Sequence, residues 1–91
     1  MTITDIKVRK LIPEGRLKAV VSITIDDTIA IHDIKVIKGS ERLFVAMPSR
    51  RDESGSFRDI AHPITFGARA DLEQKILAAY YSAVQNSISR Q

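Results

Sequence analysis

The spacing of the apolar residues changes once along this 91-residue chain, and that change restricts the fold more than any other feature. Up to about residue 61, apolar and polar residues alternate in short runs, as in β-strands that bury one face. From about Gly67 the apolar residues recur every four positions, as in an amphipathic helix: Leu72, Ile76, Tyr80, Val84 and Ile88. The sequence therefore predicts an α+β domain, with an antiparallel sheet in meander order followed by one long C-terminal helix over about 67–89.

About five strands are expected in this sheet, which extends over about residues 3–61. Their ranges are 3–11, 16–26, 29–38, 43–47 and 57–61. In the third range the apolar positions change from odd (Ile29, Ile31) to even (Ile34, Val36). Such a shift by one residue indicates a bulge or bend, here near His32-Asp33. Before the helix, the residue at position 65 is a threonine and is the candidate N-cap.

Length and composition are those of a single globular domain over residues 1–91. Hydrophobic residues make up 44% and charged residues 27% of the chain, which argues against intrinsic disorder. No apolar run approaches the ~20 residues that cross a bilayer, and the first residues do not resemble a signal peptide. The chain has no cysteine and therefore no disulfide or cysteine–zinc site. We expect a cytoplasmic protein that does not enter a membrane.

The second, third and fourth predicted strands carry apolar residues on both faces. The run Leu43 to Met47 (LFVAM) is the clearest case. One helix covers only one face of a sheet, so the other face is either buried against a second copy or left as an exposed apolar patch. We expect burial against a second copy, in a homodimer formed through the sheets.

Residues suited to catalysis or metal binding are few. The two histidines, His32 and His62, are not part of a set of histidines and carboxylates spaced as metal ligands. His32 and Asp33 could bind a metal together only across a bulge, because successive strand residues point to opposite faces. A local hydrogen bond of His32 is the preferred interpretation. No nucleophile elbow or phosphate-binding glycine loop is present. We expect no enzymatic activity, no cofactor, no metal and no small-molecule substrate.

Two adjacent arginines, Arg50 and Arg51, precede a polar turn at Gly55. One interpretation is that charge at a hairpin tip discourages edge-to-edge aggregation, with Asp52 and Glu53 pairing with the arginines. The other is contact with phosphate groups of nucleic acid. A guanidinium group binds two phosphate oxygens at once, and a hairpin can enter a groove.

Two further features bear on nucleic-acid binding. Phe57 could stack on a base, but a single aromatic residue in a strand is more often part of the core, which is the interpretation we favour. Lys7 and Arg9 would form a basic stripe with Lys18 if the strand register placed all three on one face. The net charge of +3 is by itself weak support for a nucleic-acid partner.

The stretches HDIKVI, LFVAMPS and FRDIAHPI occur in this order along the chain. Together they closely resemble the stage V sporulation protein G (SpoVG) family, and the resemblance extends over about Ile3 to Ala79 without a gap. It implies a small cytoplasmic bacterial protein with an antiparallel sheet and a C-terminal helix, which dimerises through its sheets. It also implies a regulator of gene expression that binds DNA and RNA and is linked to septation and sporulation.

In that family the nucleic-acid contacts are attributed to basic residues of the loop after the LFVAMPS stretch and of its return strand. By position, the resemblance assigns them to Arg50, Arg51 and Arg58. The family loop commonly continues Thr-Pro-Asp-Gly, where this chain has DESG over 52–55, and the two acids should weaken phosphate binding. A second function stays open, that of a protein-interaction module in septation without direct nucleic-acid binding.

Overall fold

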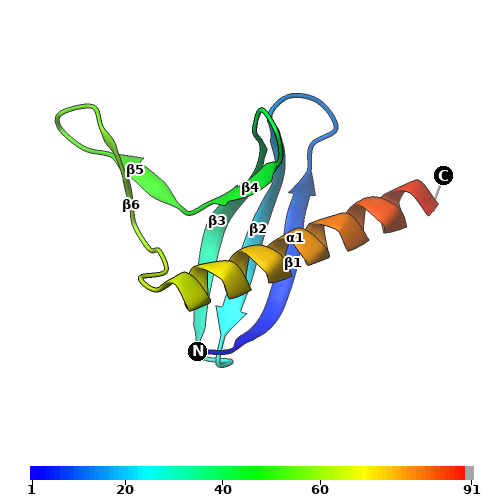
Figure 1. Cartoon of the computed structure of the whole chain (residues 1–91), viewed down its shortest axis with the longest axis horizontal. Coiled ribbons are helices and arrows are strands. Elements are labelled where there is room, and N and C mark those ends of the chain that lie inside the picture. Colours follow the sequence, from blue (N-terminus) through cyan, green and yellow to red (C-terminus); the bar gives the residue numbers. More distant parts are fainter. Residues whose placement is uncertain (90–91) are drawn as a thin grey trace.

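Residues 1–89 are described by a computed structural model, in which a four-stranded sheet is covered on one face by a long helix (Figure 1). The last two residues of the domain expected over 1–91 lie outside the described part. The elements are β1 (Ile3–Leu11), β2 (Leu17–Ile25), β3 (Ile29–Lys38), β4 (Leu43–Ala46), β5 (Ser49–Arg51), β6 (Phe57–Asp59) and α1 (Phe66–Ser89). The predicted α+β class and the C-terminal helix are confirmed.

The main sheet has the order β1-β2-β3-β4 with every neighbouring pair antiparallel, which confirms the meander. The prediction of a fifth strand in this sheet is wrong. After β4 the chain passes through Pro48, which has no N–H to donate to a ladder, and β5 and β6 then pair only with each other. The sequence interpretation missed β5 and gave β6 two residues too many at its end.

The hydrophobic core lies between α1 and the sheet face that α1 covers. Its buried members come from β2, β3, the β4 segment and the helix: Ala19, Val21, Ile23, Ile34, Val36, Val45, Met47, Leu72 and Ile76. The four-residue spacing of the helix places Leu72 and Ile76 on one stripe, and both are buried. The start of the helix is fixed by Thr65, whose Oγ1 accepts a hydrogen bond from the backbone N–H of Ala68 at 3.1 Å, which confirms the predicted N-cap.

The predicted bulge in β3 is present. Val21 pairs with Ile34 and Ile23 with Ile31, so β3 holds one residue more than β2 between these pairs. Asp33 lies in this bulge and has a φ of 61°. This is the left-handed region, which aspartate tolerates better than most residues. Ile31 and Ile34 are three positions apart, which in a regular strand would place them on opposite faces. The bulge keeps both on the helix side of the sheet.

The sheet face turned away from α1, here called the outer face, is partly apolar. Register places Leu17, Ile37 and Phe44 in one row across β2, β3 and β4, and all three remain half-exposed. The expectation of apolar residues on both faces is therefore confirmed for these strands. Within residues 1–89 no helix is long and apolar enough to span a membrane.

Candidate nucleic-acid interface

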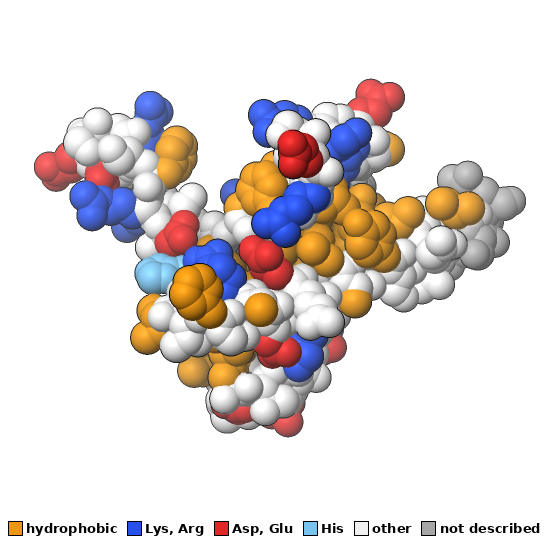
Figure 2. Space-filling view, in the orientation of Figure 1, with side chains coloured by type: hydrophobic (Ala, Val, Ile, Leu, Met, Phe, Trp, Pro, Cys, Tyr) orange, Lys and Arg blue, Asp and Glu red, His pale blue; other side chains and the backbone are white. Residues whose placement is uncertain are grey.

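The hairpin formed by β5, β6 and their turn, residues 49–59, stands away from the sheet and helix (Figure 1). We call this hairpin the arm, and the sheet with α1 the body. All six strand residues of the arm are exposed. Its base is closed by a backbone hydrogen bond from Ile60 N–H to the carbonyl of Pro48, at 2.7 Å. Figure 2 shows basic side chains on the arm, all of them arginines, and an open notch that separates the arm from the upper part of the body.

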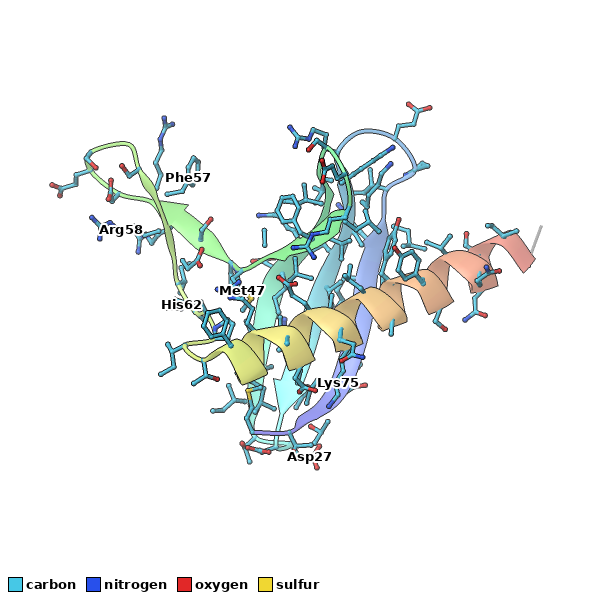
Figure 3. All side chains as sticks on the ribbon, viewed as in Figure 1. Asp27, Met47, Phe57, Arg58, His62 and Lys75 are labelled. Carbon is cyan, nitrogen blue, oxygen red and sulfur yellow. The ribbon has the colours of Figure 1, made fainter. Side chains whose placement is uncertain are left out.

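The arm brings together all three arginines that the family resemblance assigned, but it divides them between two faces. Arg50 pairs across the hairpin with Arg58, and Arg51 pairs with Phe57. Because paired residues share a face and neighbours alternate, Arg50 and Arg58 lie on one face and Arg51 lies on the other. Figure 3 shows Phe57 and Arg58 on opposite sides of the arm, in agreement with this register.

Asp52 holds the tip of the arm together. Its Oδ1 accepts hydrogen bonds from Ser54 N–H (2.9 Å), Ser54 O–H (2.6 Å) and Ser56 N–H (3.0 Å). Its Oδ2 accepts one from Arg58 Nε at 2.7 Å. These donors stabilise the carboxylate, Ser54 most and then Arg58, and lower the pKa of Asp52 from 3.8 to about 2. Gly55 completes the turn with a φ of 86°, a conformation that favours glycine.

The ion pair between Asp52 and Arg58 shows which of the arginines is paired with an acid of the tip. Asp52 pairs with Arg58 across the hairpin and makes no ion pair with Arg50 or Arg51. Arg50 and Arg58 are like charges directly opposite each other, so the carboxylate also relieves their repulsion. Within residues 1–89, Arg50 makes no side-chain hydrogen bond or ion pair and is exposed. Of the three candidate arginines, Arg58 is thus the one that forms an ion pair within residues 1–89.

Arg51 is held on the other face of the arm. Its Nε donates a hydrogen bond to the carbonyl of Gly55 at 3.3 Å, and its guanidinium carbon lies 5.7 Å from the centre of the Phe57 ring. The expectation that Phe57 belongs to the core is wrong, because 72% of this residue is exposed. A strand residue is buried only where another layer faces it, and no element among residues 1–89 covers this face of the arm.

The charges of the arm balance. Residues 49–59 carry three arginines and three carboxylates, those of Asp52, Glu53 and Asp59. A shallow open depression on the arm is lined by Arg50, Arg51, Asp52, Glu53, Arg58, Asp59 and Ile60. With no net charge, the attraction of the arm for an anion depends on which groups it presents and on their direction.

A second polar cluster lies on the outer face of the sheet. Ser22, which is 7% exposed, shares hydrogen bonds with Arg9 Nε (3.3 Å) and His32 Nδ1 (2.9 Å). The local hydrogen bond expected for His32 is therefore present. Lys18 instead donates to the carbonyl of Pro13 and lines a groove beside α1, so the basic stripe with Arg9 does not form. Within residues 1–89 no group of three or more His, Cys, Asp or Glu is placed to hold a metal ion.

Comparisons with known proteins agree on one family. The model of the SpoVG family matches residues 1–82. Over 86 residues the chain is 54% identical to the "Putative septation protein SpoVG" of Agathobacter rectalis, a match that covers 94% of this chain and 99% of that protein. It is 52% identical to the "Putative septation protein SpoVG 1" of Listeria monocytogenes over 91 residues, 100% of this chain and 89% of that protein. Neither the family description nor these names mention an enzymatic activity.

Proposed function

This chain belongs to the SpoVG family, and we propose that it is a non-enzymatic regulator that binds nucleic acid, with Arg50 and Arg51 contacting phosphate groups. The observation that carries the proposal is the arm itself. It contributes no residue to the core, yet it presents exposed guanidinium groups on an ordered hairpin. The hairpin fixes where the backbone of each arginine lies, and the planar guanidinium group suits bidentate contact with phosphate oxygens.

The division of the arginines between two faces fits a groove in nucleic acid. A two-stranded ribbon can enter the major groove of B-form DNA, which is about 12 Å wide. An arm that enters edge-first turns Arg50 toward one bordering backbone and Arg51 toward the other. We assign Arg58 a smaller part, because its Nε already donates to Asp52 and a phosphate would compete with that carboxylate.

We also propose that the functional form is a homodimer that buries the outer face. Its support is the half-exposed apolar row of Leu17, Ile37 and Phe44, which α1 does not cover. A two-fold axis would present two arms and double the phosphate contacts. Sedimentation velocity on wild type and on Ile37→Lys tests this, and a wild-type protein that is monomeric at every concentration would contradict it.

The proposed phosphate contacts are tested by fluorescence-anisotropy titration at several salt concentrations. The variants are Arg50→Ala/Arg51→Ala and, as a matched control, Arg42→Ala/Arg69→Ala, which removes two exposed arginines from the body. For wild type, log K should fall with log salt. The arm variant should bind more weakly and flatten that slope by about 2 per arm engaged, roughly one per phosphate lost, and the control should retain the wild-type slope.

A protein-interaction role in septation is the second candidate function, and one observation favours it. The segment between the arm and α1 exposes Ile60 at 65% and Ile64 at 87%, and Phe66, the first residue of α1, is 94% exposed. Exposed apolar residues this close together in sequence suit contact with a protein. Such contact would depend little on salt. Wild-type protein that binds neither duplex nor single strand at low salt would exclude phosphate contact and leave this function in its place.

A further inference from the structure

Phe57 is mostly exposed, although a hydrophobic side chain of this size is normally buried. A phenylalanine that is 72% exposed adds nothing to the core, and its neighbours along β6 are charged. Phe57 lies opposite Arg51 in the hairpin register, and the Arg51 guanidinium lies over its ring at 5.7 Å. The guanidinium thus lies against one face of the ring, and we call the two side chains together the platform.

The platform is fixed in place by contacts within the arm. Arg51 Nε donates to the carbonyl of Gly55, on the turn that Asp52 holds together through Ser54 and Ser56. This hydrogen bond uses one N–H of the guanidinium, and the N–H groups of its two Nη atoms make no hydrogen bond within residues 1–89. The platform therefore offers a largely open aromatic ring beside donors suited to a phosphate.

We propose that Arg51 and Phe57 form a binding site for an unpaired nucleotide, in which the base stacks on Phe57 and the adjoining phosphate binds Arg51. The inference rests on the proposed function and specifies its ligand as single-stranded nucleic acid. In a duplex the faces of the bases are stacked on their neighbours, so only an unpaired base can reach the ring. Stacking tolerates any base, so the site should show little sequence preference.

The opposite face of the arm makes the inference testable. Arg50 and Arg58 lie there without an aromatic partner, so that face can bind phosphates but cannot stack a base. Loss of Phe57 should therefore weaken binding of single strands and leave binding of duplexes nearly unchanged. Loss of Arg50 should weaken both, because both ligands carry phosphates.

The experiment compares one labelled single strand of mixed sequence with a long duplex of the same sequence, at one fixed, low salt concentration. Phe57→Leu removes the aromatic face but keeps an apolar side chain of similar bulk, whereas Phe57→Tyr keeps the aromatic face. Phe66→Leu is the matched control, because Phe66 is 94% exposed and lies outside the arm. Phe57→Leu should lower affinity for the single strand roughly 5- to 100-fold. Phe57→Tyr and Phe66→Leu should bind like wild type.

The possible outcomes separate this inference from the proposed function. If Phe57→Leu binds the single strand as tightly as wild type does, no base stacks on Phe57 and this inference fails, whereas the proposed phosphate contact through Arg50 and Arg51 is not affected. If the variant loses affinity for both ligands equally, Phe57 supports the structure of the arm and does not stack on a base. If wild type binds neither ligand even at low salt, the proposed function and this inference both fail.

Discussion

The body and the arm of this protein differ in what holds each of them together. The body is held by side chains removed from water, such as Ile34 and Ile76, neither of which is exposed at all. The arm has no buried strand residue, and its turn is held by one carboxylate, that of Asp52, with three hydrogen bonds to Ser54 and Ser56. Stability should therefore reside in the body, whereas the arm supplies groups that face a partner.

Truncating the core should have the largest effect on stability. Ile76→Ala removes a fully buried side chain from α1 and leaves a cavity, so the free energy of unfolding should fall by about 2–5 kcal/mol. Urea denaturation measures this change. Ile64→Ala, at an 87% exposed position, is the control and should stay within about 0.5 kcal/mol of wild type. Equal losses for the two variants would contradict the assignment of stability to the buried side chains of the body.

The N-cap of α1 should have a smaller effect. Thr65→Ala leaves the N–H of Ala68 without its acceptor, and the free energy of unfolding should fall by about 1 kcal/mol. Thr65→Ser keeps a hydroxyl and should retain most of that stability. If the Ser variant is as unstable as the Ala variant, the methyl group of Thr65 and not its oxygen is what matters.

The ion pair on α1 should contribute less again. Lys75 Nζ lies 3.2 Å from Asp71 Oδ1, one helical turn away, and both side chains are partly exposed. Lys75→Met keeps the length of the side chain and its helix propensity, and should cost about 0.2–0.5 kcal/mol at low salt. The same measurement in high salt should show almost no difference from wild type, and a difference that persists would point to packing instead of charge.

Removing the charge that organises the arm should have the smallest effect on global stability. Asp52→Asn breaks the ion pair with Arg58, but no core residue loses a contact, so the urea midpoint should not move. The local effect should be clear, because hydrogen exchange at the Ser54 and Ser56 amides should become faster. A lowered urea midpoint would show that the arm and the body unfold as one unit.

The same carboxylate sets the pH response of the arm. Its pKa is lowered from 3.8 to about 2, so its stabilising contacts are fully present above pH 3.8 and are lost as the pH falls toward 2. An NMR titration of the Asp52 side-chain carboxyl should therefore show a midpoint near 2. In Arg58→Ala the midpoint should shift upward, though only in part, because the Ser54 hydrogen bonds are the larger cause.

The sequence predicted the body well because burial leaves a pattern in it. The ranges of β1 and β3 match the structure, and the phase shift between Ile31 and Ile34 located the bulge. The arm leaves no such pattern. Alternation of polarity reports which face of a strand is buried, and in β5 neither face is buried. The same limit explains Phe57, because a sequence shows that a residue is aromatic but not whether another layer covers it.

The sequence placed the three candidate arginines near one another but did not predict how they are arranged. Arg50, Arg51 and Arg58 do lie together on one hairpin. That Arg50 and Arg51 face opposite ways follows from β5 being a strand, which the sequence did not indicate. The pairing of Asp52 with Arg58 depends on the hairpin register, and the register is set by the turn at Gly55 and not by the spacing of the charges.

The attachment of the arm by its base alone, where Ile60 N–H meets the carbonyl of Pro48, has a consequence for how such a protein can evolve. A substitution at the tip alters neither the core nor the pairing of the main sheet, so it does not have to be compensated elsewhere. Descendants of one ancestor can therefore diverge at the tip, and acquire different targets, while inheriting the same scaffold.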